Sequence, residues 1–206
     1  MSQSRHLLVY LGVLLGVLIW SAIRPHDYLT WFLEVLPLFL AVGLLAITYP
    51  RFKLTTLIYF LVMIHGIILI VGGHYTYAEM PLFDWFKHQF HLQRDDYDRV
   101  GHFAQGFVPA LITRELLLRI SPLKRGKLLA FLVVSVCLAF SALYELFEWQ
   151  AAVILGSSAD AFLGTQGDPW DTQKDMATCL VGSMVSLVVM SRLHDKFLAK
   201  EFPERL

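Results

Sequence analysis

The feature that most constrains this chain is a series of six apolar stretches, each about as long as a bilayer is thick. A membrane-spanning helix needs about 20 mainly apolar residues. The six stretches cover residues 7–23, 29–49, 54–76, 99–120, 128–149 and 172–193. They fill most of the 206 residues and leave only short connections. The sequence therefore predicts an all-α polytopic membrane protein, with residues 1–206 forming a single integral membrane domain.

The composition agrees with a membrane protein. Charged residues make up 17% of the chain and hydrophobic residues 56%, whereas about 25% of the residues of a soluble domain are charged. We expect membrane lipids as partners and no nucleic acid, and the sequence makes no prediction of the oligomeric state.

The basic residues predict the orientation, because the cytoplasmic connections of a membrane protein carry the excess of lysine and arginine. One alternate set of connections and chain ends holds eleven of these residues, and the other set holds five. The richer set is Arg5, Arg51, Lys53, Arg119, Lys124, Arg125, Lys127, Arg192, Lys196, Lys200 and Arg205. Both termini are thus predicted to be cytoplasmic.

Two outer connections have a pattern of their own. Apolar residues recur at helical spacing over residues 82–90, which predicts a short amphipathic helix on the outer surface. The last outer connection, residues 151–167, either caps the bundle or re-enters the membrane, and we favour a cap.

Acidic residues are concentrated at the opposite side of the membrane from the basic residues. Thirteen of the seventeen fall in the predicted outer half of the protein. Acidic residues contribute little to insertion, so topology does not explain this surplus. Because charges inside a membrane are unfavourable, ionisable residues within spans are candidates for function.

Asp98 and His102 are four residues apart at the outer start of the fourth span, so they share one helix face. A carboxylate one turn away can orient a histidine ring and raise its basicity. We favour a functional role for His102. For Asp98, stabilisation of the helix N-terminus explains the residue equally well.

Glu145 and Glu148 lie near the outer end of the fifth span. Counted from Lys127, Glu145 is about 27 Å along the helix. A glutamate near a helix C-terminus is opposed by the helix dipole, and its short stem limits snorkelling. Both residues therefore need a compensating cation, metal ion or proton.

Asp168, Asp171 and Asp175 lie around the start of the sixth span. We predict Asp168 as the N-cap, with Pro169 at the first helical position. Asp175 lies one turn beyond Asp171 on the same face, too far inside the helix for a capping role.

These residues would lie at a common depth if the last three spans are neighbours. The predicted site residues are His102, Glu145, Glu148 and Asp175, with Asp98 as a fifth candidate. Several carboxylates in a dehydrated space cannot all stay ionised without a proton or a cation. A divalent metal ion, such as magnesium, manganese or calcium, would suit such ligands. Its predicted ligands are His102, Glu145, Glu148, Asp171 and Asp175.

Other polar residues give weaker signals. His74 and Glu34 have a suitable depth to join the site, whereas His65 is interpreted as a hydrogen-bonded core histidine. Arg114 and Glu115, near the inner end of the fourth span, are assigned no catalytic role.

Three motifs resemble a known family. They are Tyr97-Asp98-Arg99-Val100-Gly101-His102-Phe103, Tyr144-Glu145-Leu146-Phe147-Glu148-Trp149 and Asp168-Pro169-Trp170-Asp171-Thr172-Gln173-Lys174-Asp175-Met176. The chain resembles the YjdF family of uncharacterised bacterial inner-membrane proteins, and the resemblance implies that location. More loosely, the second half resembles the VanZ-like membrane proteins, which implies a role at the cell envelope and transfers at most Asp98, His102, Glu148 and Asp175.

Three functions fit these observations. The first is action on lipid or envelope-precursor head groups at the outer face, as an enzyme or as a binding protein, with or without a divalent metal ion. The second is proton- or cation-coupled transport, which would need polar residues across the whole membrane. The third is a structural or assembly role in which Arg94, Arg99 and Lys174 neutralise the acidic cluster.

Overall fold

The computed structural model describes residues 3–156, 160–163 and 165–203. Every regular element in these residues is a helix, which confirms the predicted all-α fold. The long helices are α1 (Gln3–Ser21), α2 (Tyr28–Thr48), α3 (Thr56–Tyr75), α5 (Tyr97–Ile120), α6 (Lys127–Leu155) and α8 (Asp171–Glu201). The short ones are the 3-10 helix η1 (Tyr77–Glu79), α4 (Pro81–Phe90) and α7 (Asp160–Leu163).

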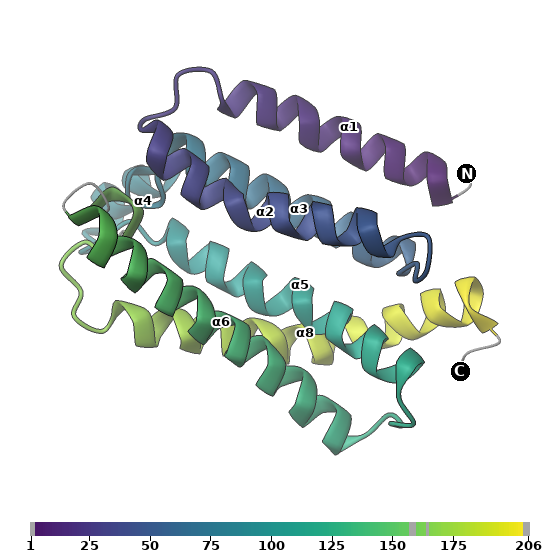
Figure 1. The fold of residues 1–206 in the computed structure, drawn as a ribbon. Helices are drawn as coiled ribbons and strands as arrows, with labels where there is room; N and C mark the ends of the chain where they lie inside the picture. Colours follow the sequence, from purple (N-terminus) through teal and green to yellow (C-terminus); the bar gives the residue numbers. More distant parts are fainter. Residues whose placement is uncertain (1–2, 157–159, 164, 204–206) are drawn as a thin grey trace.

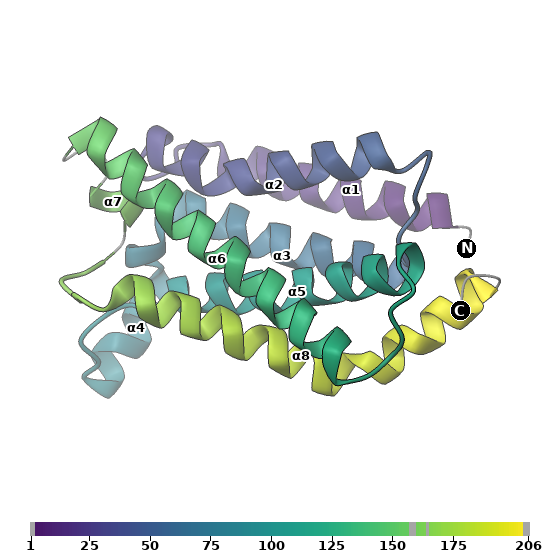
Figure 2. The ribbon, with the colours of Figure 1, turned by 60° about the horizontal axis from the view of Figure 1, so that its bottom comes forward.

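The long helices form two groups of three. Helices α1 and α2 both pack against α3, and α5, α6 and α8 pack against one another. The two groups meet where α3 packs against α5. Both termini lie at one end of the bundle, here called the termini end, and α4 and α7 lie at the other, called the α4 end (Figure 1, Figure 2).

Five helices of the described chain are long and apolar enough to cross a membrane: α1, α2, α3, α6 and α8. Helix α5 has 24 residues, but charged side chains lie near both of its ends. It packs against α3, α6 and α8, so its polar groups face protein. The predicted six spans are therefore five apolar helices and one polar central helix.

Several predicted boundaries differ from the structure. Helix α4 agrees with the amphipathic helix predicted over residues 82–90. Helix α6, however, continues to Leu155 and α8 to Glu201. The predicted connection 151–167 is thus partly helical, and α7 within it packs against α6 and α2. Residues 157–159 and 164 of this connection lie outside the described residues.

The predicted start of the last helix was wrong. Helix α8 begins at Asp171 with Trp170 as its N-cap residue. The Asp168 carboxylate instead accepts a hydrogen bond from the Trp170 backbone N–H at 3.0 Å. This bond closes an Asx turn over residues 168–170, and the helix follows that turn. The helix therefore begins two residues later than this capping prediction.

The closest helix contact is between α5 and α8. A Cβ atom added to Gly106 would collide with the carbonyl oxygen of Cys179. One added to Gly182 would collide with the carbonyl oxygen of Phe103. Small residues at such positions let two membrane helices approach closely and gain van der Waals contact.

We predict that Gly106→Ala and Gly182→Ala lower the thermal stability of the detergent-solubilised protein, because a rigid backbone atom occupies the space of each new methyl group. Overpacking of this kind costs about 1–3 kcal/mol or more. Gly12→Ala and Gly16→Ala are matched controls, since nothing lies within 4 Å of their added Cβ atoms. Thermal unfolding curves that coincide for Gly106→Ala and the unchanged protein would contradict this packing.

Candidate functional site

Two arginines hold the acidic residues of α8 at the α4 end. Arg99, in the first turn of α5, pairs with Asp175 and also with Asp171, at 2.6 Å from Nη2 to Oδ1. Arg94, in the connection before α5, pairs with the same Asp171 oxygen and lies 3.4 Å from Asp98. Because Asp171 and Asp175 are one turn apart, they form one acidic face of α8 that the two guanidinium groups cover.

Asp168 lies at the rim of this ion-pair network. Its Oδ2 atom accepts a hydrogen bond from Lys174 Nζ at 2.6 Å and lies 3.7 Å from both Arg94 and Arg99. The hydrogen bond from Lys174 holds the pKa of the Asp168 carboxyl below its usual value. The three basic residues of this network are the ones expected to neutralise the acidic cluster if the protein has a structural or assembly role: Arg94, Arg99 and Lys174.

Asp95 fixes the chain that carries Arg94. Its buried carboxylate accepts hydrogen bonds from the backbone N–H groups of Met80, at 2.8 Å, and Tyr97, at 2.9 Å. Its own N–H donates to the side chain of Gln166 at 2.8 Å. Burial raises the pKa of this carboxyl. Asp95 therefore joins the start of α4, the start of α5 and the connection before α8.

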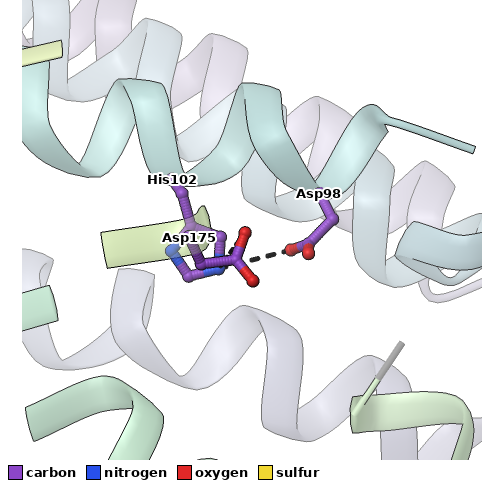
Figure 3. A group of neighbouring side chains, drawn as sticks. All are labelled: Asp98, His102 and Asp175. Atoms are coloured by element: carbon purple, nitrogen blue, oxygen red, sulfur yellow. Dashed lines mark ion pairs between the residues drawn. The ribbon is translucent and has the colours of Figure 1, made fainter. Parts of the chain in front are cut away.

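His102 lies at the centre of the site. Its Nε2 atom is 3.3 Å from Asp98, 3.7 Å from Asp175 and 3.8 Å from Glu145. Its Nδ1 atom contacts Gln105 Oε1 at 2.9 Å. Asp98 and His102 project from α5 toward the Asp175 carboxylate (Figure 3). The predicted residues Asp98, His102, Glu145 and Asp175 therefore converge from three helices.

Asp98, His102 and Asp175 are also the group best placed to hold a metal ion. Each offers a ligand atom, and these atoms lie within 4.8 Å of one another. Two carboxylates and one imidazole would suit manganese or magnesium. Asp175 is already paired with Arg99, so an ion would compete with that guanidinium. The predicted ligand set that includes Glu145, Glu148 and Asp171 stays a prediction.

Next to His102, a polar cavity of about 70 Å³ lies between the two helix groups. Its polar lining comes from α2, α3, η1, α5 and α6: Glu34, His65, Tyr77, Asp98, His102, Gln105, Tyr144 and Glu148. Two buried atoms at the site, Tyr77 Oη and Glu145 Oε1, have no hydrogen-bond partner within the described residues. Buried polar atoms are normally hydrogen-bonded, so these atoms have capacity for a ligand or water.

Some of the weaker candidates from the sequence line this cavity, and one does not. Glu148 and Glu34 line it together with His65, which was interpreted as a core histidine. His74 lies elsewhere, with its Nδ1 atom 2.9 Å from the Ser21 carbonyl oxygen. Sequence reasoning missed the role of Tyr77, because a tyrosine in a connection carries no periodic signal.

A second buried polar cluster lies at the termini end. The Glu115 carboxylate accepts hydrogen bonds from the backbone and side chain of Thr55, at 3.0 Å and 2.8 Å. It also lies 3.0 Å from His194 Nε2. Arg114 bonds to Asp195 at 2.7 Å. These contacts join α3, α5 and α8. They give the charged residues of α5 near Glu115 a structural role, in agreement with the prediction of no catalytic role for them.

We predict that Arg99→Gln destabilises the protein by about 3–5 kcal/mol, the usual effect of leaving one member of a buried ion pair without its partner. Asp171 and Asp175 would both lose a counter-charge. Lys174→Gln is the matched control, because the side chain of Lys174 is 56% exposed and that of Arg99 only 16%. Denaturant or thermal unfolding in detergent measures both. Equal effects of the two substitutions would show that the network is a surface feature.

Comparison with known proteins defines the family. Residues 6–196 match the family described as "Predicted membrane protein (DUF2238)". The chain is 48% identical over 184 residues to "Inner membrane protein YjdF" of Escherichia coli (strain K12), which covers 89% of this chain and 88% of that protein. No solved structure matches the chain. The looser likeness to VanZ-like proteins has no support from these matches. With a match over nearly its whole length, the chain belongs to the DUF2238 family of predicted membrane proteins.

Proposed function

We propose that this membrane protein binds the ammonium-bearing head group of a lipid or envelope precursor in the cavity at its α4 end. The observation that carries the proposal is the lining of that cavity. Glu34, Asp98 and Glu148 bring three carboxylates to a space of about 70 Å³, and Tyr77 adds a phenolic oxygen without a partner in the described chain.

The size of the cavity limits what can enter it. One water molecule needs about 10–15 Å³ of such space, so the cavity has room for a few water molecules or for a terminal aminomethyl group. A whole head group is too large. The phosphate of a bound lipid would therefore remain outside, with only its ammonium end among the carboxylates.

Charge selects between classes of head group. A bare phosphate would be repelled by the carboxylates, whereas an ammonium group would be attracted. Arg94 and Arg99 do not reverse this preference, because Asp168, Asp171 and Asp175 already pair with them. The proposal is therefore specific to cationic or zwitterionic head groups over anionic ones.

The proposed orientation exposes this cavity to the outer leaflet. Within the described residues, ten of the lysine and arginine residues in connections and chain ends belong to the termini end and five to the α4 end. Since the positive end of a membrane protein is cytoplasmic, both termini would be cytoplasmic. The similar protein of Escherichia coli is named an inner membrane protein. In that membrane, the cavity would face the periplasm.

A metal-bridged phosphate is a second candidate ligand. It is favoured by the three ligand atoms of Asp98, His102 and Asp175, which lie within 4.8 Å of one another. A divalent ion there would polarise a phosphoryl oxygen as a Lewis acid. The competing pair between Arg99 and Asp175 makes this the weaker of the two forms.

Transport ranks behind binding. The backbones of α5 and α8 touch at Gly106 and Gly182, which leaves no room for a substrate between these helices. The Glu115 and His194 side chains further along are fully buried and bonded to each other. The structural alternative is supported by the ion pairs of Arg94 and Arg99, but those pairs do not include the glutamates that line the cavity.

We expect Glu148→Gln and Glu34→Gln to weaken binding of phosphatidylethanolamine to the purified protein by about tenfold to a hundredfold. The reason is the loss of a charge-assisted hydrogen bond, which contributes about 1.5–3 kcal/mol. Native mass spectrometry with added lipid measures the bound fraction. Glu79→Gln is the matched control, because Glu79 lies at the same end but is exposed and outside the cavity.

Three results would overturn this proposal. Glutamine variants that lose phosphatidylglycerol binding to the same extent as phosphatidylethanolamine binding would show that no ammonium group is recognised. Glutamine variants that unfold instead of losing the lipid would favour the structural alternative. Uptake into proteoliposomes driven by a pH gradient, and lost in Glu145→Gln, would favour transport.

A chelator distinguishes recognition of an ammonium group from binding of a metal-bridged phosphate. If the ammonium group alone is recognised, removal of divalent ions with EDTA should leave lipid binding unchanged. Binding that EDTA abolishes and added Mn²⁺ restores would identify the metal-bridged form. In that case His102→Gln should also weaken Mn²⁺ binding, measured by electron paramagnetic resonance, because it removes one of the three ligand atoms.

A further inference from the structure

A second hollow, of about 460 Å³, lies between α1, α2 and α3 toward the termini end. Three helix faces form it. The face of α3, which is its floor, presents Tyr59, Val62 and Met63. The face of α2 presents Val42, Leu45, Ala46 and Tyr49. Spacings of three and four residues define one side of a helix, so each helix turns a whole face toward a space that no other helix fills.

The wall formed by α1 gives the hollow its length. It presents Ser4, Leu7, Leu8, Leu11 and Leu14. From Ser4 to Leu14 the helix rises about 15 Å, which is half of a hydrocarbon core about 30 Å thick. The hollow is therefore an apolar groove as deep as one leaflet. An acyl chain is the ligand whose length and chemistry fit such a groove.

The polar end of this groove is basic. Lys53 places its ammonium 5.0 Å from the ring centroid of Tyr49, a residue of the groove. Arg51 lies between these two in the chain, and Arg5 follows the groove residue Ser4. None of the residues that line the groove is acidic. Basic pockets between membrane helices bind anionic lipid head groups.

We infer that this groove binds one anionic phospholipid from the leaflet at the termini end. One acyl chain lies among α1, α2 and α3, and the phosphate lies against Arg51 and Lys53. The charge preference is opposite to that of the acidic cavity at the α4 end, so the two sites select different lipids. This inference does not depend on the proposed function, because it concerns other residues and another leaflet.

The first test fills the groove. Ala46→Phe places a ring among the groove residues of α2, and Ala41→Phe is the matched control, since Ala41 is exposed on the same helix but outside the groove. The probe is phosphatidylglycerol added to the protein in detergent, with the bound fraction measured by native mass spectrometry. We expect Ala46→Phe to lower binding about tenfold, the change that corresponds to 1.4 kcal/mol, and Ala41→Phe to leave it unchanged.

The second test removes the charges. Arg51→Ala with Lys53→Ala should lower phosphatidylglycerol binding by about tenfold or more, since each basic side chain near an anionic surface contributes to attraction. Lys124→Ala with Lys127→Ala is the matched control, because these exposed lysines lie at the same end but away from the groove. All four side chains are exposed, so this test remains decisive even if Ala46→Phe fails to fold.

Three results would overturn the inference. The first is a loss of phosphatidylethanolamine binding in the Arg51 and Lys53 variant as large as its loss of phosphatidylglycerol binding. The second is loss of binding in the Lys124 and Lys127 control to the same extent as in the Arg51 and Lys53 variant. The third is phosphatidylglycerol binding that survives removal of Arg51 and Lys53.

Discussion

The contact between α5 and α8 is the constraint on which the rest of the structure depends. At Gly106 and Gly182 each helix presses against a backbone carbonyl of the other. This proximity brings Asp98 and His102 of α5 within reach of Asp175 of α8. A wider separation of the two helices would pull the ion pairs of the α4 end apart. Packing of small residues in the middle of the bundle therefore sets the geometry of the polar groups at its end.

The acidic residues of the candidate site at the α4 end divide into two classes. The aspartates of α8 and of the turn before it have arginine or lysine partners. Glu145 and the glutamates of the cavity do not share these partners, and Glu145 Oε1 is buried without a hydrogen bond in the described chain. A buried carboxylate without a counter-charge is unfavourable. The class without an arginine or lysine partner, rather than the paired one, is where a cationic ligand would be stabilised.

The sequence could predict proximity between residues of the candidate site where the signal was local. Asp98 and His102 share a helix face because they are four residues apart, and their convergence with Asp175 follows from the packing of neighbouring helices. The α8 cap was wrong because Asp168 bonds to its own turn. Glu34 and His65 could not be assigned with certainty, since their contact with α5 joins helices from opposite halves of the chain.

The sequence by itself determined the class of the protein, the number and direction of its long helices, and the polarity of charge between the two ends. These properties follow from the length of apolar runs and from the placement of charged residues, which need no knowledge of neighbours. Only the tertiary structure decided which carboxylates are paired, that a polar cavity lies between the two helix groups, and that an apolar groove lies between α1, α2 and α3. Those features depend on distances between helices, because both hydrogen bonds and close packing act only over a few ångströms.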